Sequence, residues 1–203
     1  MFIQVIQGMC SDEAMLRGHM ERWREDLSPG ALGWLGGTYG MTEDGQFVGV
    51  VRFESREAAA RNSLRPEQGM WWDAASRCFE GDVTFHDCDD AIMMLDGGSD
   101  DAGFVQVIQG RLADPQRFRM FMSQPMDALQ AARPEIIGGT IAIDADGWFT
   151  ETMAFRSEAE ARAGEAVPMP DELAEPFNRE MEQVQDLRFL DLHHPWFATA
   201  MMP

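Results

Sequence analysis

Hydrophobic and polar residues follow one succession of patterns near the start of the chain. Residues 2–8 are rich in β-forming side chains and end at a glycine, which predicts a strand. A helical stripe follows between the capping residues Ser11 and Asp12 and a Ser-Pro-Gly stop at 28–30, and its apolar members are Leu16, Met20, Trp23 and Leu27. A strand and then a helix are therefore predicted for the first 30 residues.

The same succession returns about a hundred residues later. The strand pattern of 2–8 reappears at 104–110, and a Gly-Gly-Thr strand at 36–38 reappears at 138–140. Each Gly-Gly-Thr strand leads through an Asp-Gly pair into another apolar run, which predicts a hairpin because that turn needs positive φ. Self-similarity at a nearly fixed offset indicates two copies of one unit.

Each copy closes with a second helix, which begins after Ser55 or Ser157, and a last strand near 83–87 or 187–191. The order β-α-β-β-α-β is the ferredoxin-like, split-βαβ arrangement of the α+β class. Apolar residues at both strand parities indicate that neither sheet face is wet, so two sheets can cover each other. We therefore expect two tandem ferredoxin-like units forming an intramolecular, pseudo-dimeric α/β barrel.

The unit limits predicted from these patterns are 1–95 and 104–203, the latter including a C-terminal tail. Residues 96–103 are rich in Gly, Ser and Asp, a composition that suits a flexible linker. If the copies cover each other's sheets within one chain, no obligatory partner subunit remains. A monomer with internal pseudo-two-fold symmetry is expected.

The third strand of each copy runs into a short motif, Phe53-Glu54-Ser55 or Phe155-Arg156-Ser157, followed by a helix. With this motif the chain resembles the dimeric α/β barrel superfamily, particularly its antibiotic-biosynthesis-monooxygenase-like branch. The resemblance implies a pocket for a small apolar or aromatic molecule and monooxygenase-like oxidoreductase chemistry that needs no cofactor. In that branch a histidine often lies nine residues after the aromatic, where this chain has Asn62 and Gly164.

The chain contains 35 acidic and 16 basic residues, giving a net charge of −19, and every basic residue is arginine. Such a charge repels nucleic acid and anionic lipid, so neither is expected as a partner. No apolar run is long enough to span a bilayer, and the first residues enter the strand pattern directly instead of forming a signal peptide. With an odd number of cysteines, a cytoplasmic setting is the simplest prediction.

Candidate ligand-binding residues lie mainly in the first copy. Trp71 and Trp72 stand where the second copy has Glu175 and Pro176, so they could roof a pocket for a flat ligand or simply pack on the sheet. Gln4 belongs to a set of glutamines at strand positions that recurs in both copies. Buried amides need partners, so these glutamines either bond across the pseudo-symmetric interface or line a cavity. Asn62 joins Gln4, Trp71 and Trp72 as a predicted ligand-binding residue.

Two histidine-containing patterns are candidates for chemistry. His19 could act as a base or proton relay, although its place corresponds to Phe121, which favours a packing role. His86, Cys88 and Asp90 alternate along a predicted strand and carry metal-competent atoms, but no fourth ligand is evident. His19 is the candidate catalytic residue, and no metal is expected.

Two functional hypotheses remain open. The first is a small-molecule-binding barrel that acts as a cofactor-independent monooxygenase, a reaction that asks the protein for a base, polar orientation and a dry cavity. The second is a non-catalytic ligand-binding or structural barrel that has lost the catalytic residues. A closed cavity with a titratable side chain would favour the enzyme, and a filled interior would favour the second hypothesis.

Overall fold

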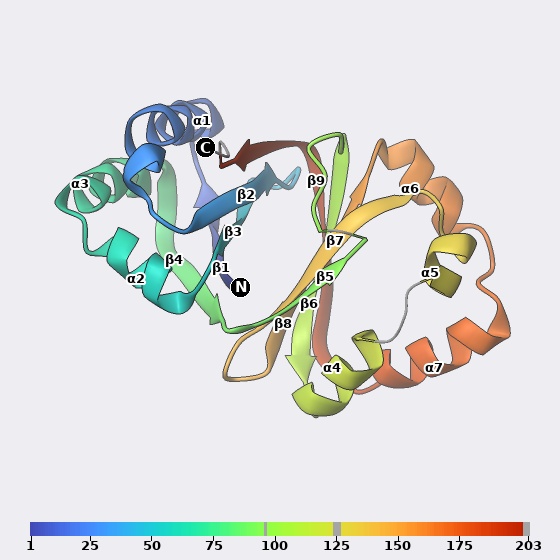
Figure 1. Ribbon diagram of the computed structural model, residues 1–203. Helices are drawn as coiled ribbons and strands as arrows, with labels where there is room; N and C mark the ends of the chain where they lie inside the picture. The colour runs from blue at the N-terminus through green and yellow to red at the C-terminus, as the bar shows by residue number, and fades with distance from the viewer. Residues whose placement is uncertain (96, 124–126, 201–203) are drawn as a thin grey trace. The chain divides into compact units, whose positions relative to one another are not determined.

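The computed structural model describes residues 1–95, 97–123 and 127–200 (Figure 1). The chain divides into two compact units, and the order of strands and helices in unit 1 recurs in unit 2 from β6 onward. Unit 1 comprises residues 1–89 together with the C-terminal residues from Trp196 onward, and unit 2 comprises residues 90–195. The fold is α+β, as predicted, and the strand pairs with a defined register are antiparallel.

Unit 1 begins with a strand and alternates strands with helices in the ferredoxin-like order. Its elements are β1 (Phe2–Cys10), α1 (Glu13–Arg22), a π-helical turn η1 (Trp23–Leu27), a 3-10 turn η2 (Ser28–Gly30), β2 (Trp34–Met41), β3 (Gln46–Phe53), α2 (Arg56–Ser63), α3 (Pro66–Ala75), a 3-10 turn η3 (Ser76–Cys78) and β4 (Phe79–Cys88). Its strands are hydrogen-bonded in the order β4-β1-β3-β2, followed by the end of β9.

Unit 2 repeats this arrangement after one additional strand. Its elements are β5 (Asp90–Met94), β6 (Phe104–Leu112), α4 (Pro115–Met122), α5 (Asp127–Ala132), β7 (Ile136–Ile143), β8 (Trp148–Phe155), α6 (Glu158–Glu165), α7 (Asp171–Met181) and β9 (Val184–Thr199). The strand order β9-β6-β8-β7 matches β4-β1-β3-β2 position by position, and β5 follows β7. The two predicted ferredoxin-like units are therefore present.

The ends of the two units differ from the limits predicted from sequence. Residues 90–94 pair with β7 in unit 2, from Asp90 opposite Ile143 to Met94 opposite Gly139. The last residues of β9 lie beside β2 in unit 1, where Ala200 N donates to the carbonyl of Leu35 at 3.5 Å. The predicted linker at 96–103 contains no helix or strand among its described residues and lies within unit 2. A local pattern predicts a strand but not the sheet edge that it joins.

Caps and turns follow the local sequence closely. Asp12 accepts a hydrogen bond from the N–H of Met15 at 2.8 Å, which caps α1 as predicted. The two predicted hairpins are confirmed by the antiparallel β2–β3 and β7–β8 pairs. Their turns contain Gly45 at φ +87 and Gly147 at φ +77, a region that glycine adopts without strain.

Two helices end earlier than their apolar patterns predicted. The apolar stripe from Leu16 to Leu27 predicts a single α-helix. In the structure α1 ends at Arg22, and the π-helical turn η1 follows it directly. The second helix predicted after Ser55 is likewise two helices, because Pro66 separates α2, which carries Asn62, from α3, which carries Trp72. Proline lacks an N–H and disfavours the helical conformation in the residue before it, and Arg65 accordingly has φ −70 and ψ 130.

The helices of each unit cover one face of its sheet (Figure 1). In unit 2, Phe118 and Met122 of α4 pack with Ile141 and Phe149 of the sheet in a closed apolar cluster. In unit 1 the corresponding layer is built from aromatic rings, with Trp23 and Trp34 meeting edge to face at a centroid distance of 4.9 Å. The helix–sheet layer of unit 1 also contains a cavity.

Candidate functional site

A cavity of about 80 Å³, the inner cavity, lies between the helices and the sheet of unit 1. The sheet contributes Gln4, Ile6, Tyr39, Phe47, Val51 and Phe53. The helices contribute Leu16, Met20, Trp23, Asn62, Ser63, Gln68, Trp71 and Trp72, and Phe79 of β4 completes the lining. All four predicted ligand-binding residues therefore line one space, although ligand binding by them stays a prediction.

The two amides among these residues already have one protein partner each. Gln4 Nε2 donates to Asp87 Oδ1 at 2.8 Å, and Asn62 Oδ1 accepts from Arg65 at 2.9 Å. Asn62 is only 6% exposed, so its polar atoms are sheltered from bulk water. Gln4 thus lines a cavity and binds an aspartate of the neighbouring strand, and Gln106 repeats this pairing with Asp191 at 3.3 Å.

The tryptophans form a connected aromatic wall. Trp71 and Trp72 have ring centroids 6.0 Å apart, and Trp71 lies 6.3 Å from Trp23. The indole N–H of Trp71 donates to the backbone carbonyl of His19 at 2.8 Å, and that of Trp23 donates to Gln68 Oε1 at 2.6 Å. The N–H groups of Trp23 and Trp71 are thus satisfied by the protein, and all three rings line the cavity.

His19 does not line the inner cavity with its imidazole ring. The ring is half-buried on α1, where its Nδ1 lies 3.2 Å from Arg22, and its pKa is lowered by burial and by that guanidinium. The residue contributes to the site through its carbonyl group, which holds Trp71. A catalytic role for His19 stays a prediction, and the geometry supports the packing role more directly.

Tyr39 is a cavity residue that the sequence analysis did not single out. It is 3% exposed, and burial raises the pKa of its hydroxyl, which is therefore neutral at physiological pH. No hydrogen-bond partner of this hydroxyl is found among the described residues, so the hydroxyl is available to form a hydrogen bond with a ligand. The available signal was its rarity: Tyr39 is the single tyrosine of the chain, and the matched position holds Ile141.

A second cavity, the outer cavity, has a volume of about 170 Å³ and adjoins the first. Met20, Trp23 and Tyr39 line both spaces. The outer cavity adds charged groups from the first helical segment and residues from the end of β9, which are Arg17, Glu21, Arg24, Trp196, Phe197 and Ala198. The lining of the inner cavity, by contrast, includes no Asp, Glu, His or Arg.

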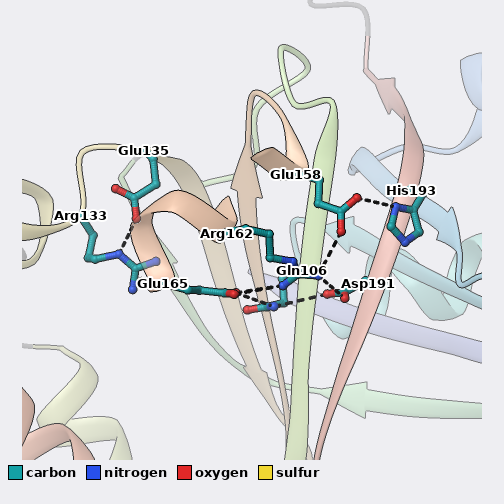
Figure 2. A network of polar contacts seen from close by, with 8 residues as sticks. All are labelled: Gln106, Arg133, Glu135, Glu158, Arg162, Glu165, Asp191 and His193. Carbon is teal, nitrogen blue, oxygen red and sulfur yellow. Dashed lines mark hydrogen bonds and ion pairs between the residues drawn. The ribbon is translucent and has the colours of Figure 1, made fainter. Parts of the chain in front are cut away.

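In unit 2 the matching helix–sheet layer holds a network of polar contacts (Figure 2). Arg162 of α6 is central to it, and Gln106 Nε2 donates to Glu165 Oε1 at 3.1 Å. The connected residues are Gln106, Glu158, Arg162, Glu165, Asp191 and His193. Beside Gly164, which matches Asn62, lies the carboxylate of Glu135, and a Cβ at this glycine would collide with it. The two copies therefore differ where unit 1 has its cavity.

The predicted alternation of His86, Cys88 and Asp90 on one strand is wrong. The strand β4 ends at Cys88, and Asp90 begins β5, so the three residues do not follow one continuous pleat. The described residues bring together no group of three or more His, Cys, Asp or Glu side chains suited to a metal ion. Among the described helices, none has both the length and the apolar character needed to cross a membrane.

The fold is similar to that of solved proteins along almost the whole chain. A candidate monooxygenase of Lactobacillus acidophilus NCFM is 13% identical, with a TM-score of 0.74 over 98% of this chain and 96% of its own. An anthrone oxidase-like protein is 9% identical, with a TM-score of 0.63 over 99% and 94% of the two chains. A ferredoxin-fold protein of Listeria monocytogenes 4b F2365, related to antibiotic biosynthesis monooxygenases, is 11% identical, with a TM-score of 0.52 over 95% and 94%.

At these identities the similarity shows the fold alone. The chain has the fold of antibiotic-biosynthesis-monooxygenase-like ferredoxin-fold proteins, which confirms the resemblance carried by the strand motifs. No protein-family model matches the sequence, and no curated protein matches it either.

Proposed function

We propose that unit 1 binds a small, flat, largely apolar molecule in the inner cavity, with its ring system against Trp71 and Trp72. The observation that carries this proposal is that an aromatic wall, a buried amide and the side chain of Tyr39 line one space. Binding pockets for small molecules are mostly apolar and contain a few placed polar groups, as this one does.

The size and charge of the inner cavity restrict the ligand. An apolar cavity of about 150 Å³ takes up benzene, so even a one-ring ligand must extend beyond the inner cavity of about 80 Å³ or displace side chains. A charged group in a space without ionised partners would lose its hydration without compensation. The part of the ligand that enters the inner cavity is therefore neutral, with an oxygen that accepts a hydrogen bond from Tyr39.

The catalytic form of this proposal is a monooxygenase-like oxidation without a cofactor. It is supported by the fold, by the name of the anthrone oxidase-like neighbour and by the presence of Tyr39 in the cavity lining. In such a reaction the substrate passes a proton to water and an electron to dioxygen, the substrate radical and superoxide combine to a peroxide that takes up a proton, and the O–O bond breaks with loss of water to leave the carbonyl product. A neutral phenol can donate a hydrogen bond to the substrate oxyanion formed by the first deprotonation. Tyr39 would stabilise that oxyanion and would not act as the base, because its raised pKa keeps it protonated.

The alternative is a carrier or sensor that binds the same ligand without turnover. The inner cavity favours this alternative in one respect, because its lining offers no carboxylate or imidazole as a base. The cavity is nevertheless neither filled nor devoid of titratable groups. Turnover therefore has to be measured separately from binding.

Calorimetric titration with 2-naphthol, which is neutral at pH 7, tests the binding proposal. Trp72→Ala removes one face of the wall and is expected to weaken binding about ten-fold or more, because aromatic stacking contributes roughly 1 kcal/mol beyond the area that it buries. Trp148→Ala in unit 2 is the matched control and should bind as the wild type does. Equal binding by the wild type and Trp72→Ala would contradict the proposal.

Oxygen uptake with anthrone as the probe separates the enzyme from the carrier. A stoichiometric, protein-dependent uptake that falls in Tyr39→Phe supports the oxidation. Binding of 2-naphthol without any uptake of oxygen would leave the binding proposal intact and reject this oxidation.

A further inference from the structure

Asn62 is a buried amide in the lining of the inner cavity, and a charged neighbour sets its orientation. Arg65 Nη1 donates to Asn62 Oδ1 at 2.9 Å, and a guanidinium can only donate, so the other end of the amide is the nitrogen. The residue is 6% exposed, and its Nδ2 has no hydrogen-bond partner within the described residues. Buried N–H groups are almost always hydrogen-bonded, so this donor requires a partner in the cavity.

Arg65 holds this amide from outside the lining of the inner cavity. It lies at the break between α2 and α3, where its backbone is extended. Its Nη1 also donates to the carbonyl of Leu27 at 3.0 Å, and its Nε donates to Glu67 Oε1 at 2.9 Å. The guanidinium is therefore held by three acceptors, one of which is the Asn62 oxygen.

Gln68 of α3 repeats this arrangement with a different donor. Its Oε1 accepts a hydrogen bond from the indole N–H of Trp23 at 2.6 Å. An indole N–H can only donate, so the end of the Gln68 amide that is left for another partner is again the nitrogen. The side of the lining formed by α2 and α3 therefore carries two amides oriented as donors.

Gln4, on the sheet side of the inner cavity, has the reverse polarity. Its Nε2 donates to Asp87 Oδ1 at 2.8 Å, so the end left for another partner is the oxygen. A ligand in the inner cavity is then complementary to the lining when an oxygen that accepts hydrogen bonds faces the helices. A carbonyl suits that place better than a hydroxyl, because it has two lone pairs and no hydrogen that needs an acceptor.

We propose that the inner cavity is specific for a ligand with a carbonyl oxygen, which accepts a hydrogen bond from Asn62 Nδ2. Arg65 is the positioning residue that keeps this nitrogen available to the ligand. This inference rests on the proposed binding function and adds the functional group that the cavity recognises.

The test compares acetophenone with α-methylstyrene, two probes of nearly the same shape of which only acetophenone has a carbonyl oxygen. Calorimetric titration gives the ratio of their dissociation constants, and a general change of the cavity alters both constants alike. Asn62→Asp keeps the shape of the side chain and its contact with Arg65, but it replaces the N–H donor with an oxygen. The preference for acetophenone is expected to fall by roughly five-fold or more, the effect of losing one hydrogen bond.

Asn178→Asp is the matched control, because it makes the same chemical change at an exposed position of α7. It should keep the ratio of the wild type. An unchanged ratio in Asn62→Asp, with both probes still bound, would overturn the carbonyl site and leave the proposed function standing. Failure of the wild type to bind either probe, or binding that Trp72→Ala leaves unchanged, would instead contradict the proposed function.

Arg65→Met and Arg65→Lys test the positioning role and also decide the question if Asn62→Asp does not fold. Methionine removes the donors and leaves the Asn62 amide free to turn, so the preference for acetophenone should fall several-fold. Lysine keeps a donor for Asn62 Oδ1 and should retain most of the preference. If Arg65 only stabilised the fold, Arg65→Met would weaken both probes equally, and that unchanged ratio would overturn its role in positioning Asn62.

Discussion

One cross-strand residue pair occurs in both copies of the repeat, and it contains Tyr39 in unit 1 and Glu151 in unit 2. In unit 1 Tyr39 lies opposite Gly49, and in unit 2 Ile141 lies opposite Glu151. Gly49 leaves room for the tyrosine ring, because a Cβ there would stand 3.2 Å from Tyr39 Cδ1. This pair thus places a titratable side chain on the helix-covered face of each sheet, a phenol in unit 1 and a carboxyl group in unit 2.

Glu151 is 4% exposed in an apolar layer, and burial raises its pKa to about 7. Its carboxyl group therefore stays protonated in the folded chain at pH values where the unfolded chain has already ionised. The stabilising contribution of this group is fully present below its ordinary pKa near 4.5 and is lost as the pH rises to about 7.

Replacing Glu151 with glutamine removes this pH dependence. A shift of this size corresponds to about 3 kcal/mol. The free energy of unfolding of Glu151→Gln, relative to the wild type, is expected to rise by that amount between pH 4.5 and pH 8 in urea titrations. Glu160→Gln, an exposed change on α6, should show a constant difference. A constant difference for Glu151→Gln as well would show that the carboxyl group is already solvated.

The helices of the two units contribute differently to their cores. Phe118 of α4 is 2% exposed and belongs to the apolar cluster of unit 2, whereas Phe121 is only partly buried against that cluster. In unit 1, Pro66 splits the second helical segment, so that α2 carries Asn62 and α3 carries Trp72. The break lets two short helices approach one cavity from different directions.

The loss of stability caused by shortening a side chain of α4 to alanine should therefore depend on the position of that side chain. Phe118→Ala is expected to lower the free energy of unfolding by about 3–5 kcal/mol, the cost of removing a buried phenylalanine. Phe121→Ala, on the next turn, should cost clearly less because its ring is partly exposed. Chemical denaturation of both variants measures the difference. Equal losses would contradict the assignment of Phe118 to the closed cluster.

The whole chain combines a duplicated fold with a strongly acidic composition. Its net charge of −19 opposes close approach of two copies at low ionic strength. Each unit also receives a strand from beyond its own repeat, β5 in unit 2 and the end of β9 in unit 1, which covers the edge of β7 or β2. A covered edge offers no template for a further strand.

We expect the protein to be a monomer in solution. Light scattering should give a mass near 22.8 kDa, and raising the salt concentration to screen the charges should not change it. A stable dimer at low protein concentration would contradict this prediction, and with it the idea that the two copies cover each other within one chain. Closure of the copies into a single barrel likewise stays a prediction.

The sequence by itself determined the duplication, the β-α-β-β-α-β order within each copy, the hairpins and the aromatic pair Trp71 and Trp72, but not the added strand β5 or the helix break at Pro66. These features depend on local periodicity, turn chemistry and self-similarity, all of which are readable along the chain. Tertiary structure alone decided that Tyr39 lies opposite Gly49, that Glu135 stands beside Gly164, and that Trp196 meets Arg17. Such pairs join distant segments, and their contacts depend on strand register and on which sheet edge a strand joins, neither of which leaves a local pattern.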